Sequence, residues 1–261
     1  MSTDDKTIRW YNENAESYTA HVRDTSDSVY HAYYEKPAMY ALLPDIQGKR
    51  VISLGCGSGE DAEYLRTQGA EASVGIDISA GLIEIAKTSY PACSFEVMDM
   101  ETLHFPDASF DFAYSSLAIH YIEDWTKVFA EVYRILKPQS YFLFSCGHPI
   151  RSAMELTENS DTAHVRQLAI LKDKVAKTME IKGDYLQRKM MSNALGAKMP
   201  VTTWHKPISE IISEATAAGF LLETFVEPRP LPAMKAISEG DFTRLEKIPE
   251  FMILRLVKIG E

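Results

Sequence analysis

VISLGCGSGE, residues 51–60, is the stretch that decides the fold of this 261-residue chain. Residues 51–54 predict a buried parallel strand. Gly55, Gly57 and Gly59 predict a turn whose backbone can take positive φ and lie against a ligand with no Cβ in the way. The residues after the turn resume a helical pattern that ends at Gly69. The stretch therefore predicts a nucleotide-binding turn between a strand and a helix.

A carboxylate, Asp77, stands about twenty residues after this turn, which is the spacing that lets it bond both ribose hydroxyls of an adenosine ligand. The glycine pattern is G-x-G-x-G, whereas dinucleotide sites read G-x-G-x-x-G and rest a pyrophosphate on the helix. Glu60 and Asp61 in the first helical turn would repel a phosphate, but they suit the ammonium and sulfonium of S-adenosylmethionine. The alternative is a tight strand-to-helix turn that binds no ligand.

Strand and helix patterns alternate along the chain with the spacing of parallel crossover units. Apolar residues recur at helical intervals over 125–136, and Lys137-Pro138 ends that helix. Residues 207–220 predict a further helix. The predicted strands lie near 51–54, 73–77, 94–97, 110–115 and 141–146, with two final strands in 221–228 and 251–259.

Four segments together resemble the class I S-adenosylmethionine-dependent methyltransferases of the broad small-molecule type, and the resemblance covers almost the whole chain. The segments are VISLGCGSGE, SVGIDIS, FEVMDMETLHFPDASFDFAYSSLAIHYIED and EVYRILKPQSYFLFS. The resemblance implies an α/β, Rossmann-like, doubly wound sheet of seven mostly parallel strands with the last strand antiparallel, plus a helical cap. Two departures are Ser53, where the family usually has an acid, and Gln139-Ser140, where it usually has two glycines.

The resemblance also implies which residues hold the cofactor. Asp99 and Met100 would bracket the adenine, Ser115 and Ser116 would lie near the sulfonium, and Tyr18 would approach the cofactor's carboxylate. A plain strand-end turn at 98–101 and a capping role for the serines are the alternatives. The full cofactor set is Tyr18, Gly55, Cys56, Gly57, Gly59, Asp77, Ile78, Asp99, Met100, Ser115 and Ser116.

Four segments are expected: an N-terminal helical lid (1–48), the cofactor-binding core (49–147), a substrate cap insertion (148–205), and a C-terminal helix and strands that complete the sheet (206–261). The insertion has five methionines, which would line an adaptable apolar pocket or pack short helices. It also has a surplus of three basic residues in an acidic chain. That surplus indicates either an anionic acceptor or simply a solvated basic face.

Methyl transfer is an in-line displacement, so the protein must mainly align the acceptor and exclude water. His120 is the candidate catalytic base, with a structural histidine as the alternative. Tyr11, His148, Trp204 and His205 are the candidate substrate-binding residues. No metal site is expected, because the three cysteines, Cys56, Cys93 and Cys146, are widely separated and lack metal-ligand spacing.

A formal charge of −10 argues against broad nucleic-acid binding. The sequence shows neither an apolar leader nor a run long enough for a membrane span, which predicts a cytoplasmic protein. The oligomeric state, monomer or homodimer, stays open. The sequence therefore predicts a methyltransferase that moves a methyl group from S-adenosylmethionine to an oxygen or nitrogen of a small molecule, leaving S-adenosylhomocysteine. The alternatives are a tRNA or protein methyltransferase and a non-catalytic S-adenosylmethionine-binding protein.

Overall fold

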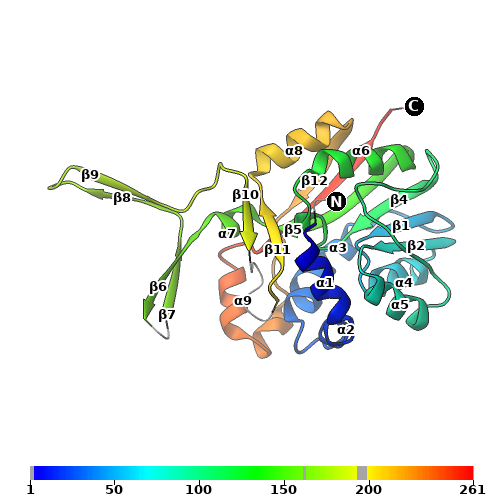
Figure 1. The fold of residues 1–261 in the computed structure, drawn as a ribbon, viewed down its shortest axis with the longest axis horizontal. Helices are drawn as coiled ribbons and strands as arrows, with labels where there is room; N and C mark the ends of the chain where they lie inside the picture. The colour runs from blue at the N-terminus through cyan, green and yellow to red at the C-terminus, as the bar shows by residue number, and fades with distance from the viewer. Residues whose placement is uncertain (1–2, 161–162, 193–198, 261) are drawn as a thin grey trace.

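A twisted seven-stranded sheet runs through the centre of the protein (Figure 1). The computed structural model describes residues 3–160, 163–192 and 199–260. The strand order is β12-β13-β5-β4-β1-β2-β3, and β13 is antiparallel to both of its neighbours while the pairs among β1 to β5 are parallel. The predicted seven-stranded, mostly parallel sheet with an antiparallel last strand is confirmed.

The predicted strand positions agree closely with the structure except at β5, which begins at Leu136 rather than at residue 141. The preceding helix ends at Ile135, and Gln139 takes a φ of +62°, so the Lys137-Pro138 segment continues as an irregular strand. The strands of the sheet are β1 (Arg50–Leu54), β2 (Ala72–Asp77), β3 (Ser94–Val97), β4 (Phe110–Ser115), β5 (Leu136–Gly147), β12 (Phe220–Val226) and β13 (Phe251–Lys258).

Helices cover both faces of the sheet, because adjacent strand residues point to opposite sides and both sides are apolar. Ile52 packs with α6 and α8 on one face, while Val51 packs with α3 and α4 on the other. No helix in the described ranges is long and apolar enough to cross a membrane. The helices around the central strands are α4 (Glu60–Thr67), α5 (Ala80–Ser89), α6 (Trp125–Ile135) and α8 (Ile208–Ala217).

The described part of the N-terminal segment is helical. It contains one π-helical turn, a feature that often marks a functional position. Its elements are α1 (Asp5–Glu13), α2 (Ala15–Arg23), the π-helix η1 (His31–Glu35) and α3 (Lys36–Ala41). Shorter helices near the site and the C-terminus are η2 (Ile119–Tyr121), η3 (Pro232–Ala236) and α9 (Glu239–Leu245).

The insertion at 148–205 is mainly β-structure, so the short helices considered for it are reduced to α7 (Pro149–Ala153) in its described part. The hairpin β8–β9 projects far from the body (Figure 1). Met179 and Met190 are more than half exposed, so neither packs in a core nor lines an enclosed pocket. The strands are β6 (Glu155–Ser160), β7 (Ala163–Gln167), β8 (Ala169–Asp173), β9 (Thr178–Lys182), β10 (Lys189–Ser192) and β11 (Thr202–His205).

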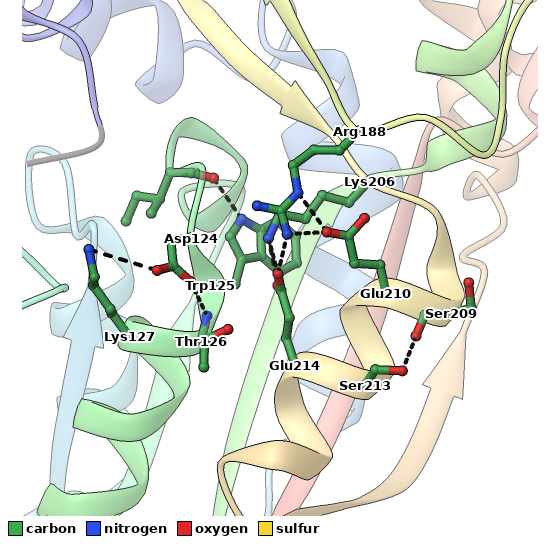
Figure 2. A network of polar contacts seen from close by, with 11 residues as sticks. Asp124, Trp125, Thr126, Lys127, Arg188, Lys206, Ser209, Glu210, Ser213 and Glu214 are labelled. Carbon is green, nitrogen blue, oxygen red and sulfur yellow. Dashed lines mark hydrogen bonds and ion pairs between the residues drawn. The ribbon is translucent and has the colours of Figure 1, made fainter.

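A buried ion pair lies where this insertion ends and the chain re-enters the core (Figure 2). The Lys206 side chain is fully buried, and its Nζ lies 2.7 and 2.5 Å from the two carboxylate oxygens of Glu214 on α8. The same Nζ sits 5.1 Å from the ring centre of Trp125 on α6. Arg188, which precedes β10, donates to Glu214 at 2.7 Å and also contacts Glu210. Burial lowers the pKa of Lys206 and raises the pKa of Glu214, so each ion depends on its partner.

Replacing Glu214 with Leu should therefore destabilise the protein by about 3–5 kcal/mol, because Lys206 is left buried without its carboxylate. Urea unfolding followed by tryptophan fluorescence measures this change. The matched control is Glu223→Leu, which removes a more exposed pair with Arg255 and should cost roughly 0.2–1 kcal/mol. Equal losses in the two variants would show that burial does not make the pair with Lys206 matter more to stability than an exposed pair.

Candidate functional site

A hollow opens at the carboxyl ends of β1, β2 and β4, the edge of an open α/β sheet where ligands bind. Its empty space, counted out into the open mouth, is about 690 Å³. Nine of the residues predicted from the sequence line it: Tyr11, Tyr18, Gly55, Gly57, Asp77, Ile78, Asp99, Met100 and Ser116. Lining residues that the sequence did not predict include Thr7, Ile8, Leu117, Ala118, Tyr121 and Ile122.

The glycine turn after β1 makes the floor of this hollow. Gly55 has a φ of +65°, and a Cβ there would lie 2.3 Å from the Cβ of Ala118, so only glycine fits. The Gly57 N–H donates to Oδ2 of Asp77 at 2.9 Å, and the Ser79 N–H donates to Oδ1 at 2.8 Å. The carboxylate at the end of β2 is thereby fixed against the turn that follows β1.

The hollow is electronegative. Asp77 and Asp99 both line it, whereas no lysine or arginine is among the described lining residues. Burial raises the pKa of Asp77, while its bonds to backbone N–H groups oppose that rise. Met100 faces the glycine turn, with its Cε 3.3 Å from where a Cβ of Gly55 would stand. Such a lining suits a cationic ligand with an adenosine part, which is the chemistry of S-adenosylmethionine.

Three tyrosines from the lid and η2 form one wall. The Tyr11 ring meets the rings of Tyr18 and Tyr121 edge to face, at centroid distances of 5.1 and 5.8 Å. The hydroxyls of Tyr11 and Tyr121 are 2.6 Å apart. Burial raises the pKa of each tyrosine, so their hydroxyls stay protonated at neutral pH. Tyr121 was not singled out by sequence reasoning, although its position next to His120 was the available signal.

Three residues of the predicted cofactor set lie near the hollow without lining it. The Cys56 side chain points into the core against Gly75, so only its backbone belongs to the turn. A Cβ at Gly59 would meet Phe95 at 2.8 Å, which makes Gly59 a packing position between α4 and β3. The Ser115 side chain is fully buried, and its hydroxyl has no hydrogen-bond partner among the described residues.

His120 lies just behind the hollow wall. Its ring packs on Tyr121 at a centroid distance of 4.7 Å, and its Nδ1 faces the Gly147 N–H at 3.4 Å. Burial lowers the pKa of His120 to about 4, so the ring is neutral at physiological pH. The side chain is therefore unprotonated and packs on Tyr121, which lines the hollow, whereas His120 itself is not among the lining residues.

The other two candidate histidines hold the insertion in place. His148 caps α7 through Nδ1, which accepts from the Ile150 N–H at 3.1 Å, while Nε2 lies 3.0 Å from Glu227. His205 accepts from the Ser152 hydroxyl at 2.6 Å and donates to a backbone carbonyl at 2.9 Å. Trp204 is half-buried and pairs with Met190 across the β10–β11 hairpin. His148, Trp204 and His205 do not line the hollow.

Beneath the hollow lies a charged network that sequence reasoning missed. Glu35, the last residue of the π-helix, is fully buried, and its Oε1 accepts from Ser145 at 2.5 Å and from Ser116 at 3.0 Å. Lys36 donates to Ser116 at 2.9 Å and contacts Asp61 on α4. Burial raises the pKa of Glu35, with Lys36 opposing that rise. The network joins the lid to the floor of the site.

This network also supports a strained turn. Leu117 has a φ of +50°, a conformation that a branched side chain rarely adopts. Its N–H donates to the Ser145 carbonyl at 3.2 Å and to the Ser145 hydroxyl oxygen at 3.0 Å. Because Ser145 in turn donates to Glu35, the carboxylate of the lid fixes the segment 116–118 that lines the hollow.

Replacing Glu35 with Ala should lower the free energy of unfolding by about 2–4 kcal/mol, because the buried Ser145 hydroxyl and the half-buried Ser116 hydroxyl lose their acceptor. Glu35→Gln keeps one carbonyl oxygen for both serines and should lose less than half as much. Chemical denaturation of the two variants measures the difference. An equal loss in both would mean that the negative charge, rather than the acceptor, matters.

Comparison with known proteins agrees with this geometry. Residues 52–144 match the methyltransferase domain family. A solved S-adenosylmethionine dependent methyltransferase from Mesorhizobium loti superposes with a TM-score of 0.71 at 26% identity, covering 88% of this chain and 99% of that one. An uncharacterized protein of Haemophilus influenzae is 27% identical over 86% of this chain and 87% of its own length.

A relative with a named activity matches over a shorter part. The malonyl-[acyl-carrier protein] O-methyltransferase of Erwinia billingiae is 34% identical over 99 residues, which are 38% of this chain and 39% of that enzyme. The match to this relative is therefore too short to include both the lid and the insertion. The domain match over residues 52–144, the superposition on the Mesorhizobium loti methyltransferase and the electronegative hollow all agree with a class I S-adenosylmethionine-dependent methyltransferase.

Proposed function

We propose that this protein transfers the methyl group of S-adenosylmethionine to an oxygen or nitrogen atom of a small-molecule acceptor. The observation that supports this most directly is the shape and lining of the hollow. One end has the glycine turn and Asp77, and the wall has three tyrosines whose hydroxyls stay protonated. The lid closes it from the side, so the site suits a small acceptor better than a long polymer.

The proposed cofactor contacts follow from the lining. Asp77 holds the ribose hydroxyls, since each carboxylate oxygen that accepts one backbone N–H has a lone pair left. Asp99 accepts from the adenine amine, and Met100 packs on the ring. Tyr18 and Ser116 serve the methionine end of the cofactor, near the Gly57 turn that a Tyr18 ring carbon approaches.

The cofactor supplies a methyl group already activated by positive sulfur. The chain aligns the acceptor and excludes water. Holding the two reactants in the right orientation accounts for much of the rate increase in a displacement reaction. An acceptor that must lose a proton needs a base, and we propose His120, whose pKa of about 4 keeps the ring unprotonated at neutral pH. Tyr11 and Tyr121 keep their protons and orient the acceptor by hydrogen bonds.

The proposed partner is a small molecule rather than a nucleic acid, because a chain with a formal charge of −10 offers little for phosphates. The Erwinia billingiae relative is named as an O-methyltransferase, which favours oxygen as the acceptor atom without naming the acceptor of this chain. A cytoplasmic location is proposed on the sequence alone.

S-adenosylhomocysteine release from purified protein and S-adenosylmethionine, with pooled small acids, phenols and amines, tests the activity. Gly57→Asp is the inactive control, because it places a carboxylate and a side chain at a φ of +54° in the floor of the hollow. Release that depends on one pool and disappears in the control supports the proposal. Cofactor binding without release from any pool would contradict a small-molecule acceptor.

Asp77→Ala should weaken S-adenosylhomocysteine binding at least tenfold, because hydrogen bonds to a charged group contribute about 1.5–3 kcal/mol each. Titration calorimetry measures the affinity. Asp77→Asn is the companion variant that keeps one oxygen acceptor for the turn, and Asp107→Ala is an exposed control on the far side of the fold. Unchanged affinity in Asp77→Ala, with the protein still folded, would exclude the ribose assignment.

A further inference from the structure

Three arginines from three separate elements gather beyond the carboxyl end of β5. They are Arg151 on α7, Arg166 on β7 and Arg244 on α9. Arg151 Nε lies 3.1 Å from Oε2 of Glu250, and Arg244 Nη1 lies 2.6 Å from the same oxygen. Two guanidinium groups therefore share a single carboxylate oxygen.

The local charges do not balance within the described residues. Arg151 Nη1 is buried and has no hydrogen-bond partner there. Arg244 has one further acid at 3.9 Å, Asp241, and donates to the Tyr30 hydroxyl at 2.9 Å. Burial lowers the pKa of Arg166, as do the nearby Arg151 and Arg244, while Glu250 opposes that shift. The cluster thus carries a positive surplus and an unused buried donor.

This surplus stands out against the rest of the chain, which is acidic overall. A guanidinium fork presents paired N–H groups that match the oxygens of a carboxylate or a phosphate. A buried N–H without an acceptor costs free energy until an acceptor arrives. A planar carboxylate or a tetrahedral phosphate would supply such an acceptor.

The cluster lies beyond the same edge of the sheet as the hollow, although none of its arginines lines the hollow. Leu117, which lines the hollow, donates to the Ser145 carbonyl, and His148 follows three residues later, roughly 10 Å along an extended strand. The Arg151 N–H then donates to the His148 carbonyl at 3.0 Å. Both positions lie at the edge of the sheet where open α/β folds bind ligands.

We infer that Arg151, Arg166 and Arg244 form a subsite for an anionic group, a carboxylate or a phosphate, at the end of the methyl acceptor away from its reacting atom. This inference rests on the proposed function, since it assigns a class of acceptor to the same site. The alternative role is structural, in which Glu250 merely ties α7 to α9.

Titration calorimetry on the full chain, loaded with S-adenosylhomocysteine, tests the subsite. The titrants are inorganic phosphate and, separately, acetate, at constant ionic strength. Arg166→Gln is the informative variant because its side chain is exposed and its loss leaves the Glu250 contacts intact. Lys174→Gln is the matched control, since it removes one positive charge from an exposed position of the same insertion.

Saturable binding of at least one anion is expected, weakened about tenfold by Arg166→Gln and unchanged by Lys174→Gln. Tighter binding of phosphate than of acetate indicates a phosphorylated acceptor, and the reverse order indicates a carboxylate. Two results would overturn the inference: no saturable binding of either anion by the loaded protein, or equal weakening in both variants. Failure of the folded protein to bind S-adenosylhomocysteine would instead contradict the proposed function.

Discussion

The close approach of the backbone at Gly55 to the turn at Ala118 is the constraint on which the site depends. Because no Cβ stands at Gly55, the chain segments that follow β1 and β4 approach so closely that a Cβ at Gly55 would lie only 2.3 Å from the Cβ of Ala118. The hydrogen bond from Gly57 to Asp77 then fixes the same turn to β2. Three strand ends are thereby held in one geometry, and the hollow is the space left between them.

Support for this geometry comes from a distance in sequence. The carboxylate of Glu35 reaches the Ser116 and Ser145 hydroxyls from the lid, and Ser145 holds Leu117 in its left-handed conformation. The lid is therefore more than a cover, because part of the floor of the site takes its shape from a buried lid residue. Such an arrangement couples the position of the lid to the shape of the hollow, since disturbing either one removes buried hydrogen bonds from the other.

The sequence predicted the parts of the fold that depend on local pattern. The strand before the glycine turn, the position of Asp77 and the two helices ended by Gly69 and Gly219 all agree with the structure. Glu35 and Tyr121 were missed because their importance comes from contacts with residues far along the chain, such as Ser145 and Tyr11. The hairpins of the insertion were missed because short runs that mix lysine, methionine and isoleucine fit a helix or a strand equally well.

The place of β13 in the sheet has a consequence for how the chain folds. β13 lies between β5 and β12 and pairs with both. The chain must therefore pass through the whole insertion before β13 can pair with β5. Pairings over such long sequence separations carry a large loop-closure cost and slow folding. During synthesis, β1 to β5 can assemble early, but the exposed edge of β5 must wait for β13. Until then that edge is open to pairing with other chains, which makes late synthesis the stage most exposed to aggregation.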